Sequence, residues 1–488
     1  MENIGDLIIN FQSNKPDKIA IIDKEKEYTS LELANKIYSL QNKLPKNING
    51  KVVLTFFPNT IEYIISYFAV SMLGGIVFPL HWKSKTREVD SAIKNSQPLL
   101  CLTNHEGVSK LKLVNIKKLV VDNKDLNDKN TPYTIRKNKD DIAILLQTSG
   151  TTDNSKIVAL THNNLISNSI AHCHSVKLDE NSRILITLPF PFGYCNTSQL
   201  IASMYLQSTL VLINDPILPS YLFKVIEKYK INTFTAVPTL LNLIEKYSLT
   251  RGTPKADLSS LNTICFGGGT ITKSKIAFLK TIFPHVSIYQ TYGQTEAGPR
   301  ITSSLIEEEY IPEKVGKPLE HVQIKILNEN LEELTSNQIG QIFVKSPGIM
   351  KGYYNNQALT DKILSDGWLA TGDLGFQDTN GYIYIKGRIK NIIKYSGYKI
   401  YPEEIESLIS NQLGITSLLL KGCMSETYGE IPVLYIKGLY DKNLEDSIFK
   451  ICRENLAFYK IPHKIFFIKD LETTKNGKLK RNLEVTNV

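Results

Sequence analysis

The residues between Gln147 and Thr161 have the types and the spacing to bind a polyphosphate. A lysine, Lys156, follows a cluster of small and hydroxyl-bearing residues, namely Thr148, Ser149, Gly150, Thr151 and Thr152. Backbone N–H groups of a small-residue loop can converge on phosphate oxygens, hydroxyls add donors, and a lysine adds positive charge. An ordinary polar hairpin loop has a similar composition, so this segment by itself leaves both interpretations open. We call residues 148–156 the hydroxyl loop.

The hydroxyl loop is not a P-loop of the nucleoside triphosphatases. The distance from Gly150 to Lys156 fits that motif, but Ser155 stands where it requires glycine. Ile157 stands where it requires serine or threonine. The β-branched, apolar run that begins at Ile157 also predicts a strand, whereas a P-loop leads into a helix.

A second polar segment, from Thr291 to Glu296, follows a predicted strand. Ligands of α/β proteins bind at the ends of such strands. Here Gly293 allows close backbone approach, Thr295 offers a hydroxyl, and Glu296 offers a hard oxygen ligand for Mg²⁺. A solvated turn is the alternative interpretation of this segment.

Three further positions have chemistry to offer. Asp373 lies in a glycine turn, residues 367–375, and could accept both hydroxyls of a ribose, although a plain turn carboxylate fits the same pattern. Lys478 belongs to a basic stretch, residues 474–481, for which a solvated terminus is the usual outcome. The glycine turn around Gly268 follows a predicted strand and by itself indicates little.

Taken together and in order, these motifs resemble those of the adenylate-forming superfamily, which includes acyl-CoA synthetases, peptide-synthetase adenylation domains and luciferases. The family's T-S-G-T-T-G-x-P-K-G and T-H-x-N patterns match at Thr148 to Thr152, Lys156 and 161–164, but Asp153, Ser155 and Ile157 depart. Four more family patterns match: Y-G-x-T-E at 292–296, G-W-x-x-T-G-D at 367–373, G-R-x-[DK]-[DN]-x-I-K at 387–394, and T-x-x-G-K-[IL]-x-R at 474–481.

The resemblance implies an ATP- and Mg²⁺-dependent activation of a carboxylic acid. In this assignment Thr295 contacts the α-phosphate, Glu296 holds magnesium, and Lys478 binds both the carboxylate and the α-phosphate. The remaining nucleotide contacts are implied for the hydroxyl loop, the glycine turn at Gly268, and the residues Tyr292, Asp373 and Arg388.

The resemblance also implies a second step, in which a thiol displaces AMP. Lys390 would be the hinge of a rotating small domain, and Lys394 and Gly397 would act with it in the hinge motion and the thiol half-reaction. Residues 395–402, which include Gly397, would line the thiol channel. The thiol would come from coenzyme A or from a phosphopantetheinyl carrier protein.

The acid is indicated by residues 188–196, which align with the family's P-x-x-H-x-x-G region. Phe192 replaces the family's histidine, and Gly193 stands where amino-acid-activating relatives carry an aspartate for the α-ammonium group. An amino acid is therefore disfavoured, and an aryl or short acyl acid is preferred. Phe192, Tyr194 and Asn196 are candidates for the acyl pocket, although structural packing explains them equally well.

The elements that must position these residues follow an α/β pattern. Strand-like runs such as 52–57, 184–188 and 232–235 alternate with helical patterns such as 61–72 and 221–230. A β-rich region begins at Gly340, and a short mixed segment follows Lys390. We therefore expect a large domain, residues 1–389, of mostly parallel sheets with covering helices and a β-rich subdomain. A small, mobile α+β domain, residues 390–488, completes the predicted fold.

Composition agrees with this assignment. A chain of 488 residues is too long to fold around a single hydrophobic core, so two or more domains are expected. Its net charge of +9 suits an anionic partner such as a nucleotide, coenzyme A or an acidic carrier protein. The sequence has no arginine-rich block of the kind that would indicate binding to a nucleic acid. The 6 scattered cysteines and the lack of a signal peptide predict a cytoplasmic protein. The uncharged run Tyr63 to Leu80 is interrupted by Gly74-Gly75, so we expect a buried helix and strand, not a membrane span.

Three classes of function remain open on the sequence alone. The first is a ligase that forms acyl-CoA, and the second is a stand-alone adenylating enzyme that loads a carrier protein. The third is a degenerate nucleotide binder without turnover, which Asp153 and Phe192 suggest. The retained residues Glu296, Asp373, Arg388 and Lys478 argue against the third class.

Overall fold

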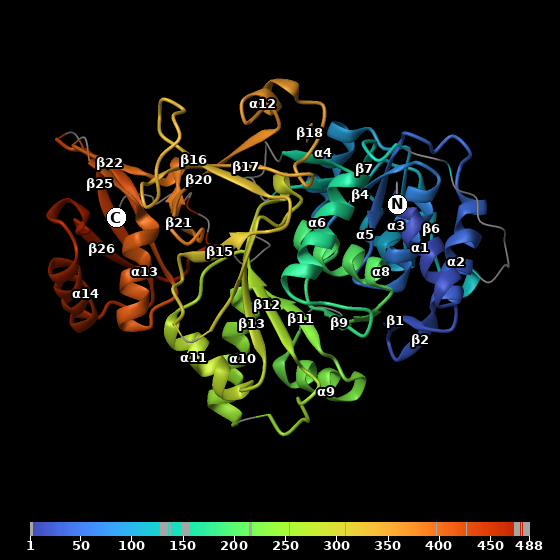
Figure 1. Ribbon diagram of the computed structural model, residues 1–488, viewed down its shortest axis with the longest axis horizontal. Helices are drawn as coiled ribbons and strands as arrows, with labels where there is room; N and C mark the ends of the chain where they lie inside the picture. The colour runs from blue at the N-terminus through green and yellow to red at the C-terminus, as the bar shows by residue number, and fades with distance from the viewer. Residues whose placement is uncertain are drawn as a thin grey trace.

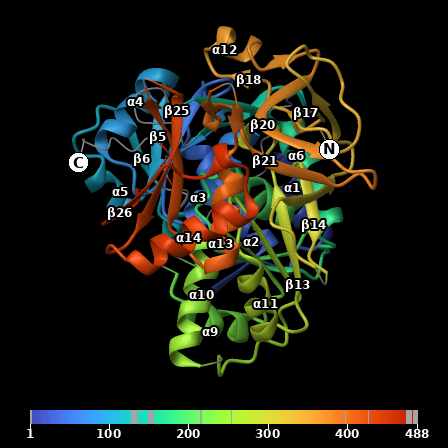
Figure 2. The ribbon, with the colours of Figure 1, turned by 90° about the vertical axis from the view of Figure 1, so that its left-hand side faces the viewer.

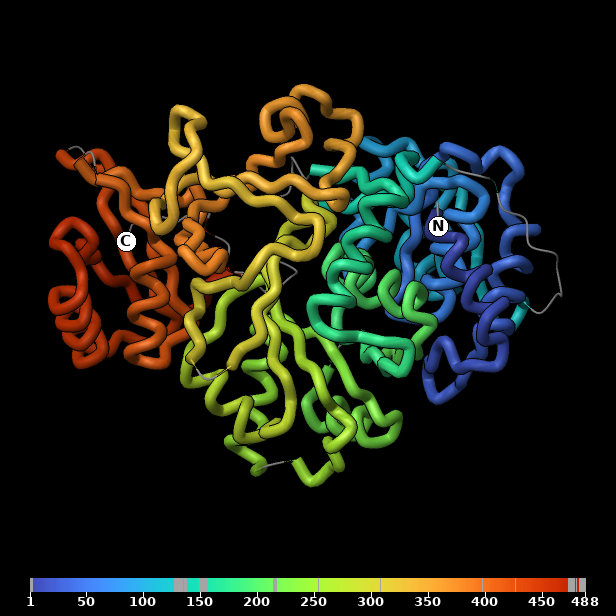
Figure 3. Tube along the Cα trace, viewed as in Figure 1, coloured from blue at the N-terminus to red at the C-terminus, as the bar shows by residue number. Residues whose placement is uncertain are grey.

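The computed structural model describes residues 3–126, 135, 138–148, 156–213, 217–252, 254–307, 309–396, 398–425, 427–472, 479 and 481. Within these residues the strands form three sheets. The chain runs from the N-terminal sheet at one end of the molecule, through a large central sheet, to a small C-terminal unit at the other end (Figures 1 and 3).

The N-terminal sheet has the order β18-β8-β7-β4-β3-β5-β6. Its parallel strands are β3 (Val52–Phe56), β4 (Ile76–Pro79), β5 (Leu100–Thr103), β6 (Lys118–Val120) and β7 (Ile142–Gln147). The antiparallel edge consists of β8 (Ile157–Thr161) and β18 (Gly352–Tyr353). The hydroxyl loop is therefore the connection of the β7–β8 hairpin.

The central sheet is parallel in its middle and antiparallel at both ends. The parallel strands are β1 (Ile19–Asp23), β10 (Thr209–Leu212), β9 (Arg183–Ile186), β11 (Thr233–Ala236), β12 (Thr263–Gly267) and β13 (Ser287–Tyr292). Antiparallel strands continue it on both sides: β2 (Lys26–Thr29), β14 (Thr302–Leu305), β15 (Lys314–Pro318), β21 (Ile383–Arg388), β20 (Trp368–Gln377), β19 (Leu364–Ser365), β17 (Gly340–Lys345) and β16 (Gln323–Leu327). The predicted β-rich subdomain is thus continuous with the parallel sheet.

Helices fill the space between these two sheets. Apolar residues from the facing sides of both sheets form one core with the intervening helices, which are α1 (Gly5–Asn14), α2 (Ser30–Lys43), α3 (Ile61–Met72), α6 (His162–Ser175), α7 (Gly193–Cys195), η2 (Asn196–Ile201) and α8 (Ala202–Leu206). α3 is buried on nearly every side, so the apolar run is the predicted helix followed by β4. Among the described residues no helix combines the length and apolarity needed to cross a bilayer.

The outer faces of the two sheets carry their own helices. The central sheet is covered by α9 (Pro219–Tyr229), α10 (Pro238–Arg251) and α11 (Lys273–Ile282). The outer face of the N-terminal sheet packs with α4 (Thr86–Ser96), near α5 (His105–Lys110). The short helices are η1 (Asn123–Asp125), η3 (Thr295–Ala297), α12 (Gln357–Asp361), η4 (Ile389–Asn391) and η5 (Phe458–Lys460). Layers of helices and mostly parallel sheets confirm the predicted α/β class.

The C-terminal unit has a sheet of its own. It contains β22 (Ile393–Tyr395), β23 (Tyr398–Ile400), β24 (Leu418–Ser425), β25 (Gly429–Lys437) and β26 (Lys464–Ile468), with helices α13 (Pro402–Leu413) and α14 (Lys442–Asn455). Pro402 opens α13 with acids in its first turn, as predicted. Figure 2 shows this unit in front of the central sheet. Its main core draws only on residues after 392, so η4 separates two cores.

Candidate active site

The Asp373 carboxylate binds two side chains from other strands of the central sheet, Tyr292 and Arg388. Tyr292 at the end of β13 donates a hydrogen bond of 2.6 Å from its hydroxyl to Asp373 Oδ2. Arg388 Nε lies 2.8 Å from Asp373 Oδ1, because the β20–β21 pairing sets these two residues opposite each other. The Asp373 carboxylate holds the pKa of Arg388 above its usual range, while burial raises the pKa of Tyr292. Three residues predicted to contact the nucleoside therefore meet at one strand end.

Tyr353 connects the hydroxyl loop to the predicted magnesium ligand. Its hydroxyl donates a hydrogen bond of 2.9 Å to Glu296 Oε1 and lies 3.3 Å from Lys156 Nζ. The lysine also stands 4.9 Å from the centre of the tyrosine ring. The pairing of β18 with β8 brings Tyr353 to this position. The sequence analysis did not single out Tyr353, since its neighbourhood in the sequence carries no motif of its own.

The base of the hydroxyl loop is closed by the backbone. The Thr148 N–H donates a hydrogen bond of 3.0 Å to the Lys156 carbonyl and extends the β7–β8 ladder by one step. The residues between these two, including Ser149, Gly150, Thr151, Thr152 and Asp153, lie outside the described residues, as do Gly397 and Lys478.

The family's T-H-x-N pattern has a structural role directly after the loop. The Thr161 side chain accepts a hydrogen bond from the Asn164 N–H, and the Asn164 side chain accepts one from the Thr161 N–H. This capping box starts α6 at the end of β8. Asn164 also donates a hydrogen bond of 2.7 Å to the Pro347 carbonyl, which ties the segment before β18 to the same corner.

Cations outnumber anions around these groups. Desolvation and the nearby cations Arg388 and Lys156 lower the pKa of Lys390, which lies in η4. Burial is the larger cause of this lowered pKa, but the presence of Arg388 and Lys156 near Lys390 is favourable for an anionic ligand. Triphosphate is such a ligand.

Glu296 suits a magnesium ion that is held largely by substrate. Among the described residues no group of three or more histidines, cysteines, aspartates or glutamates could hold a metal. Mg²⁺ is commonly bound by one or two carboxylates together with substrate phosphates and water. One hard carboxylate, oriented by Tyr353 beside a cationic region, has the donor chemistry for this arrangement.

Glycines shape the two strand ends that the sequence predicts for the nucleotide site. Gly268, directly after β12, has a φ of +79°, a conformation that favours glycine, and is exposed. At Gly293 an added Cβ would stand 1.8 Å from the Pro299 carbonyl oxygen, so only glycine fits. Thr295 follows in η3 and is half-buried. The backbone can therefore approach a ligand closely at both turns.

Two of the three acyl-pocket candidates lie near the strand ends, and the third packs in the core. The Tyr194 hydroxyl is 2.8 Å from Thr291 Oγ1 on β13, and Phe192 stacks on His81 with ring centres 5.5 Å apart. Asn196 is fully buried and bonds to the hydroxyls of Tyr63 and Tyr67 on α3. For Asn196 the packing alternative is therefore favoured.

The predicted thiol-step residues surround the connection between the two cores. Lys390 lies in η4, and Lys394 is exposed on β22, where its N–H donates a hydrogen bond of 2.7 Å to Glu430. From the basic tail, Arg481 bonds Glu406 on α13 at 2.6 Å and the Leu420 carbonyl at 3.0 Å. The arginine of the tail motif thus binds the C-terminal unit.

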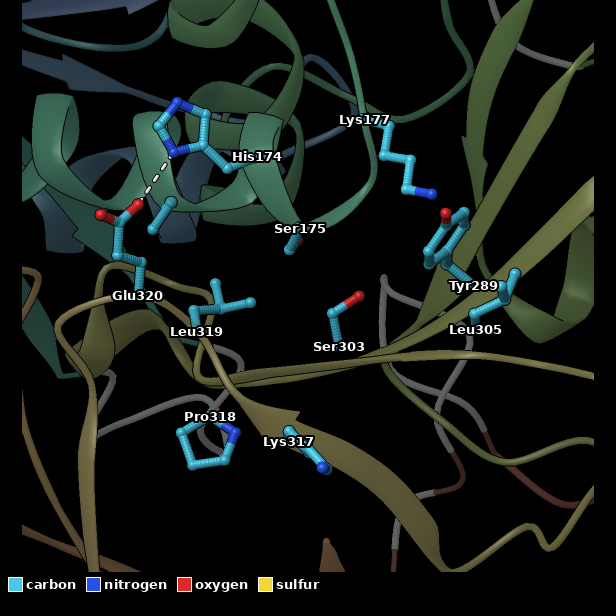
Figure 4. A pocket seen from close by; sticks show the side chains of 11 residues that line it. His174, Ser175, Lys177, Tyr289, Ser303, Leu305, Lys317, Pro318, Leu319 and Glu320 are labelled. Atoms are coloured by element: carbon cyan, nitrogen blue, oxygen red, sulfur yellow. Dashed lines mark hydrogen bonds and ion pairs between the residues drawn. The ribbon is translucent and has the colours of Figure 1, made fainter. Parts of the chain in front are cut away.

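A pocket of about 410 Å³ lies apart from these groups (Figure 4). Its lining includes Tyr289, Ser303 and Lys317, and His174 there pairs with Glu320 at 2.8 Å. No residue that the sequence analysis predicted for the site lines it. Since Asp373 on β20 lies beside Tyr292 at the end of β13 and Arg388 at the end of β21, we propose that the nucleotide binds there.

The family to which the chain belongs can now be stated. A model of the AMP-binding enzyme family matches residues 10–354, and a model of the AMP-binding enzyme C-terminal domain matches residues 404–478. The chain therefore belongs to the AMP-binding enzyme family, the adenylate-forming proteins that its motifs resemble.

Similar proteins and solved structures indicate which kind of enzyme within this family the chain is. The chain is 30% identical to the putative acyl-CoA ligase YdaB of Bacillus subtilis (strain 168), covering 99% of this chain and 98% of that protein. It is 29% identical to 4-coumarate–CoA ligase-like 9 of Arabidopsis thaliana, covering 92% and 82%. O-succinylbenzoate coenzyme A synthetase (MenE) from Bacillus subtilis, in complex with ATP and magnesium, has a TM-score of 0.86 at 26% identity and 99% coverage of both chains. The protein is accordingly an AMP-forming acid–thiol ligase of the acyl-CoA synthetase type.

Proposed function

We propose that this ligase uses Mg²⁺ and ATP to activate a small carboxylic acid, aryl or short acyl, and that coenzyme A accepts the acyl group. The meeting of Tyr292 and Arg388 on the Asp373 carboxylate carries this proposal. A buried carboxylate beside a guanidinium and the hydroxyl of Tyr292, which ends the parallel strand β13, suits the ribose of a nucleotide.

In the first step a carboxylate oxygen attacks the α-phosphorus of ATP. A bond forms between that oxygen and phosphorus, the bond to the β-phosphate bridge breaks, and pyrophosphate leaves. Two anions must approach each other, so Lys156, Arg388 and Lys478 reduce the repulsion as fixed cations. Magnesium, when held by Glu296, supplies further charge neutralisation. Asp373 and Tyr292 orient the nucleoside for in-line attack.

In the second step the thiol sulfur attacks the acyl carbon, and the bond from that carbon to the AMP oxygen breaks. The thiol and Lys478 need the same space in turn, so we propose that the domain of residues 390–488 rotates about Lys390. The separate core beyond residue 392 and the short η4 connection support a rigid-body motion. Lys394 would act in this half-reaction, and residues 395–402, which include Gly397, would line the thiol channel after the rotation.

Coenzyme A is the preferred acceptor because relatives along nearly the whole chain are named CoA ligases. A phosphopantetheinyl carrier protein remains the second candidate, favoured by the net charge of +9, which also suits an acidic protein.

The test begins with acid-dependent exchange of pyrophosphate into ATP over a panel of aryl, short acyl and amino acids. We expect exchange with at least one small acid and none with amino acids, since Gly193 offers no anion for an α-ammonium group. The acid that works is then offered with coenzyme A and, separately, with a holo-carrier protein. Thioester on the carrier alone would refute the coenzyme A assignment, and no exchange with any acid would refute the proposal as a whole.

Replacing Asp373 tests the observation on which the proposal rests. Asp373→Asn keeps the size of the side chain but removes the charge that faces Arg388. We expect the KM for ATP to rise about a hundredfold, or roughly 2.7 kcal/mol. Asp378→Asn, at the exposed turn after β20, is a matched control for which we expect no change.

A further inference from the structure

Arg300 is a buried cation for which the described residues provide no carboxylate partner. The residue is 4% exposed, and its Nη2 donates a hydrogen bond of 2.9 Å to Ser198 Oγ. Its Nε is buried and has no hydrogen-bond partner. In the part of the chain that the structure describes, no aspartate or glutamate is among the charged or titratable groups that act on it. Burying a guanidinium without a counter-ion costs free energy, so the presence of an arginine at this position calls for an explanation.

The described neighbours of Arg300 supply no negative charge. Its guanidinium carbon lies 3.3 Å from the centre of the Tyr194 ring, and its other charged or titratable neighbours include His172 and Cys265. Burial lowers the pKa of His172 well below its usual range, and burial raises the pKa of Cys265 to about 12. Both groups are therefore neutral near pH 7, and burial itself lowers the pKa of Arg300.

The backbone of Arg300 adjoins the turn that we assign to the nucleotide. The preceding Pro299 carbonyl packs against Gly293, where even a Cβ would not fit. Asn168 on α6 holds the arginine from the other side, since it accepts a hydrogen bond of 3.1 Å from the Arg300 N–H and donates one of 2.8 Å to its carbonyl. The guanidinium is therefore within one side-chain length of the turn between Tyr292 and Glu296.

Tyr194 relates this cation to the acyl pocket. The Arg300 guanidinium packs against the face of the Tyr194 ring. The Tyr194 hydroxyl lies 2.8 Å from Thr291 Oγ1 near the end of β13. Thr291 in turn donates a hydrogen bond of 3.1 Å to the Phe266 carbonyl beside the glycine turn of β12. The buried cation thus lies behind the residue that we propose for acid binding.

We propose that Arg300 binds a second anionic group of the substrate, so that the natural acid is a short dicarboxylic acid. This inference rests on the proposed function and names its substrate class. One carboxylate reacts at the nucleotide, and the other pairs with the planar guanidinium, which matches a carboxylate fork to fork. The short path from Gly293 to Arg300 limits the substrate to a few atoms between its two anionic groups. A neutral analogue would leave the guanidinium unpaired, which is the situation in which binding sites discriminate most strongly.

The test uses matched pairs of acids in the pyrophosphate-exchange assay. Each pair consists of a dicarboxylic acid of two to five carbons and its monoamide, which has the same length and no second charge. For the unaltered protein we expect kcat/KM at least a hundredfold higher for one of the diacids than for its monoamide. Equal use of both members of every pair would overturn the proposal.

Three variants separate substrate binding from a structural role. Arg300→Leu should raise the KM for the diacid at least a hundredfold with a smaller change in kcat, and should improve the use of the monoamide. A gain on the neutral acid cannot arise from misfolding. Arg300→Lys keeps the charge without the fork and should retain part of the preference. Arg251→Leu removes an exposed arginine at the end of α10 and should change nothing.

The remaining outcomes also decide the question. Retention of the diacid preference in Arg300→Leu would refute the proposal. If circular dichroism shows that this variant does not fold, the preference of the unaltered protein and the behaviour of Arg300→Lys decide. If neither diacids nor neutral acids of the wider panel support exchange, the proposed function fails and this inference falls with it. Exchange with neutral acids alone overturns this inference and leaves the proposed function standing.

Discussion

The Tyr353 hydroxyl donates a hydrogen bond of 2.9 Å to the Glu296 carboxylate, across 57 positions of the sequence. Because Lys156 approaches the same hydroxyl, the tyrosine stands between the lysine of the hydroxyl loop and the proposed magnesium ligand. A neutral donor in this position can orient the carboxylate without cancelling the charge that a cation needs. We therefore propose that Tyr353 positions the groups that would hold the metal and the phosphates.

Replacing Tyr353 by phenylalanine should weaken the use of ATP with magnesium. The ring remains beside Lys156, but the hydrogen bond to Glu296 is lost, and bonds to charged groups contribute about 1.5 kcal/mol or more. We expect the KM for ATP to rise about tenfold at limiting magnesium. Saturating magnesium should reduce this difference. Tyr354→Phe is the matched control, because Tyr354 packs on the outer core of the N-terminal sheet. Equal effects of the two variants would contradict the assignment.

Removing Lys478 should abolish adenylation and spare the thiol step. The prediction rests on the match of residues 474–481 to the family's tail motif. Lys478→Ala should lose acid-dependent pyrophosphate exchange but still form thioester from a supplied acyl-adenylate. Lys475→Ala, in the same motif at an unspecified position, should keep both activities. Equal loss of both half-reactions in Lys478→Ala would show that the assignment is wrong or that the variant is misfolded.

Replacing Lys390 by proline should impair the thiol step and largely spare adenylation, the reverse of the effect expected for Lys478→Ala. Proline restricts φ, so it should hinder rotation of the C-terminal domain about η4. Lys390→Pro should slow thioester formation much more than adenylation, as measured by single-turnover assays of each step. Lys390→Ala preserves backbone freedom and should affect the thioester rate far less. An unchanged thioester rate in the proline variant would exclude Lys390 as the hinge.

Asp23 should make the stability of the protein depend on pH. It accepts a hydrogen bond of 2.9 Å from the Ile61 N–H at the start of α3, and burial raises its pKa from 3.8 to about 6. Between about pH 4 and pH 6 the folded state therefore binds more protons than the unfolded state, so the free energy of unfolding falls as pH rises. This rise in the pKa of one group changes the free energy of unfolding by roughly 3 kcal/mol across that pH range.

Asp23→Asn tests this dependence because it retains the acceptor oxygen without the titration. Relative to the unaltered protein, the variant should gain roughly 3 kcal/mol between pH 4 and pH 7. The measurement is denaturant unfolding of both proteins at the two pH values. A stability difference that does not change with pH would refute the prediction.

The sequence by itself determined the family, the α/β class and the order of the motifs. Strand-length apolar runs, the cap at Thr161 and the proline that opens α13 act over a few residues, so local physics suffices to predict them. The residues that we propose to contact a nucleotide lie within such short motifs, which explains why Asp373, Arg388 and Glu296 could be singled out.

Only the tertiary structure decided which of these side chains meet. Tyr292 and Asp373 come together because β13 and β20 belong to one sheet, and Tyr353 reaches Glu296 because β18 joins β8. The same holds for Asn196, whose burial against two tyrosines of α3 favours packing over substrate contact. Arg300 looks like an ordinary charged residue in the sequence. Its burial, with no counter-ion among the described residues, depends on the elements that surround it, and no local pattern carries that information.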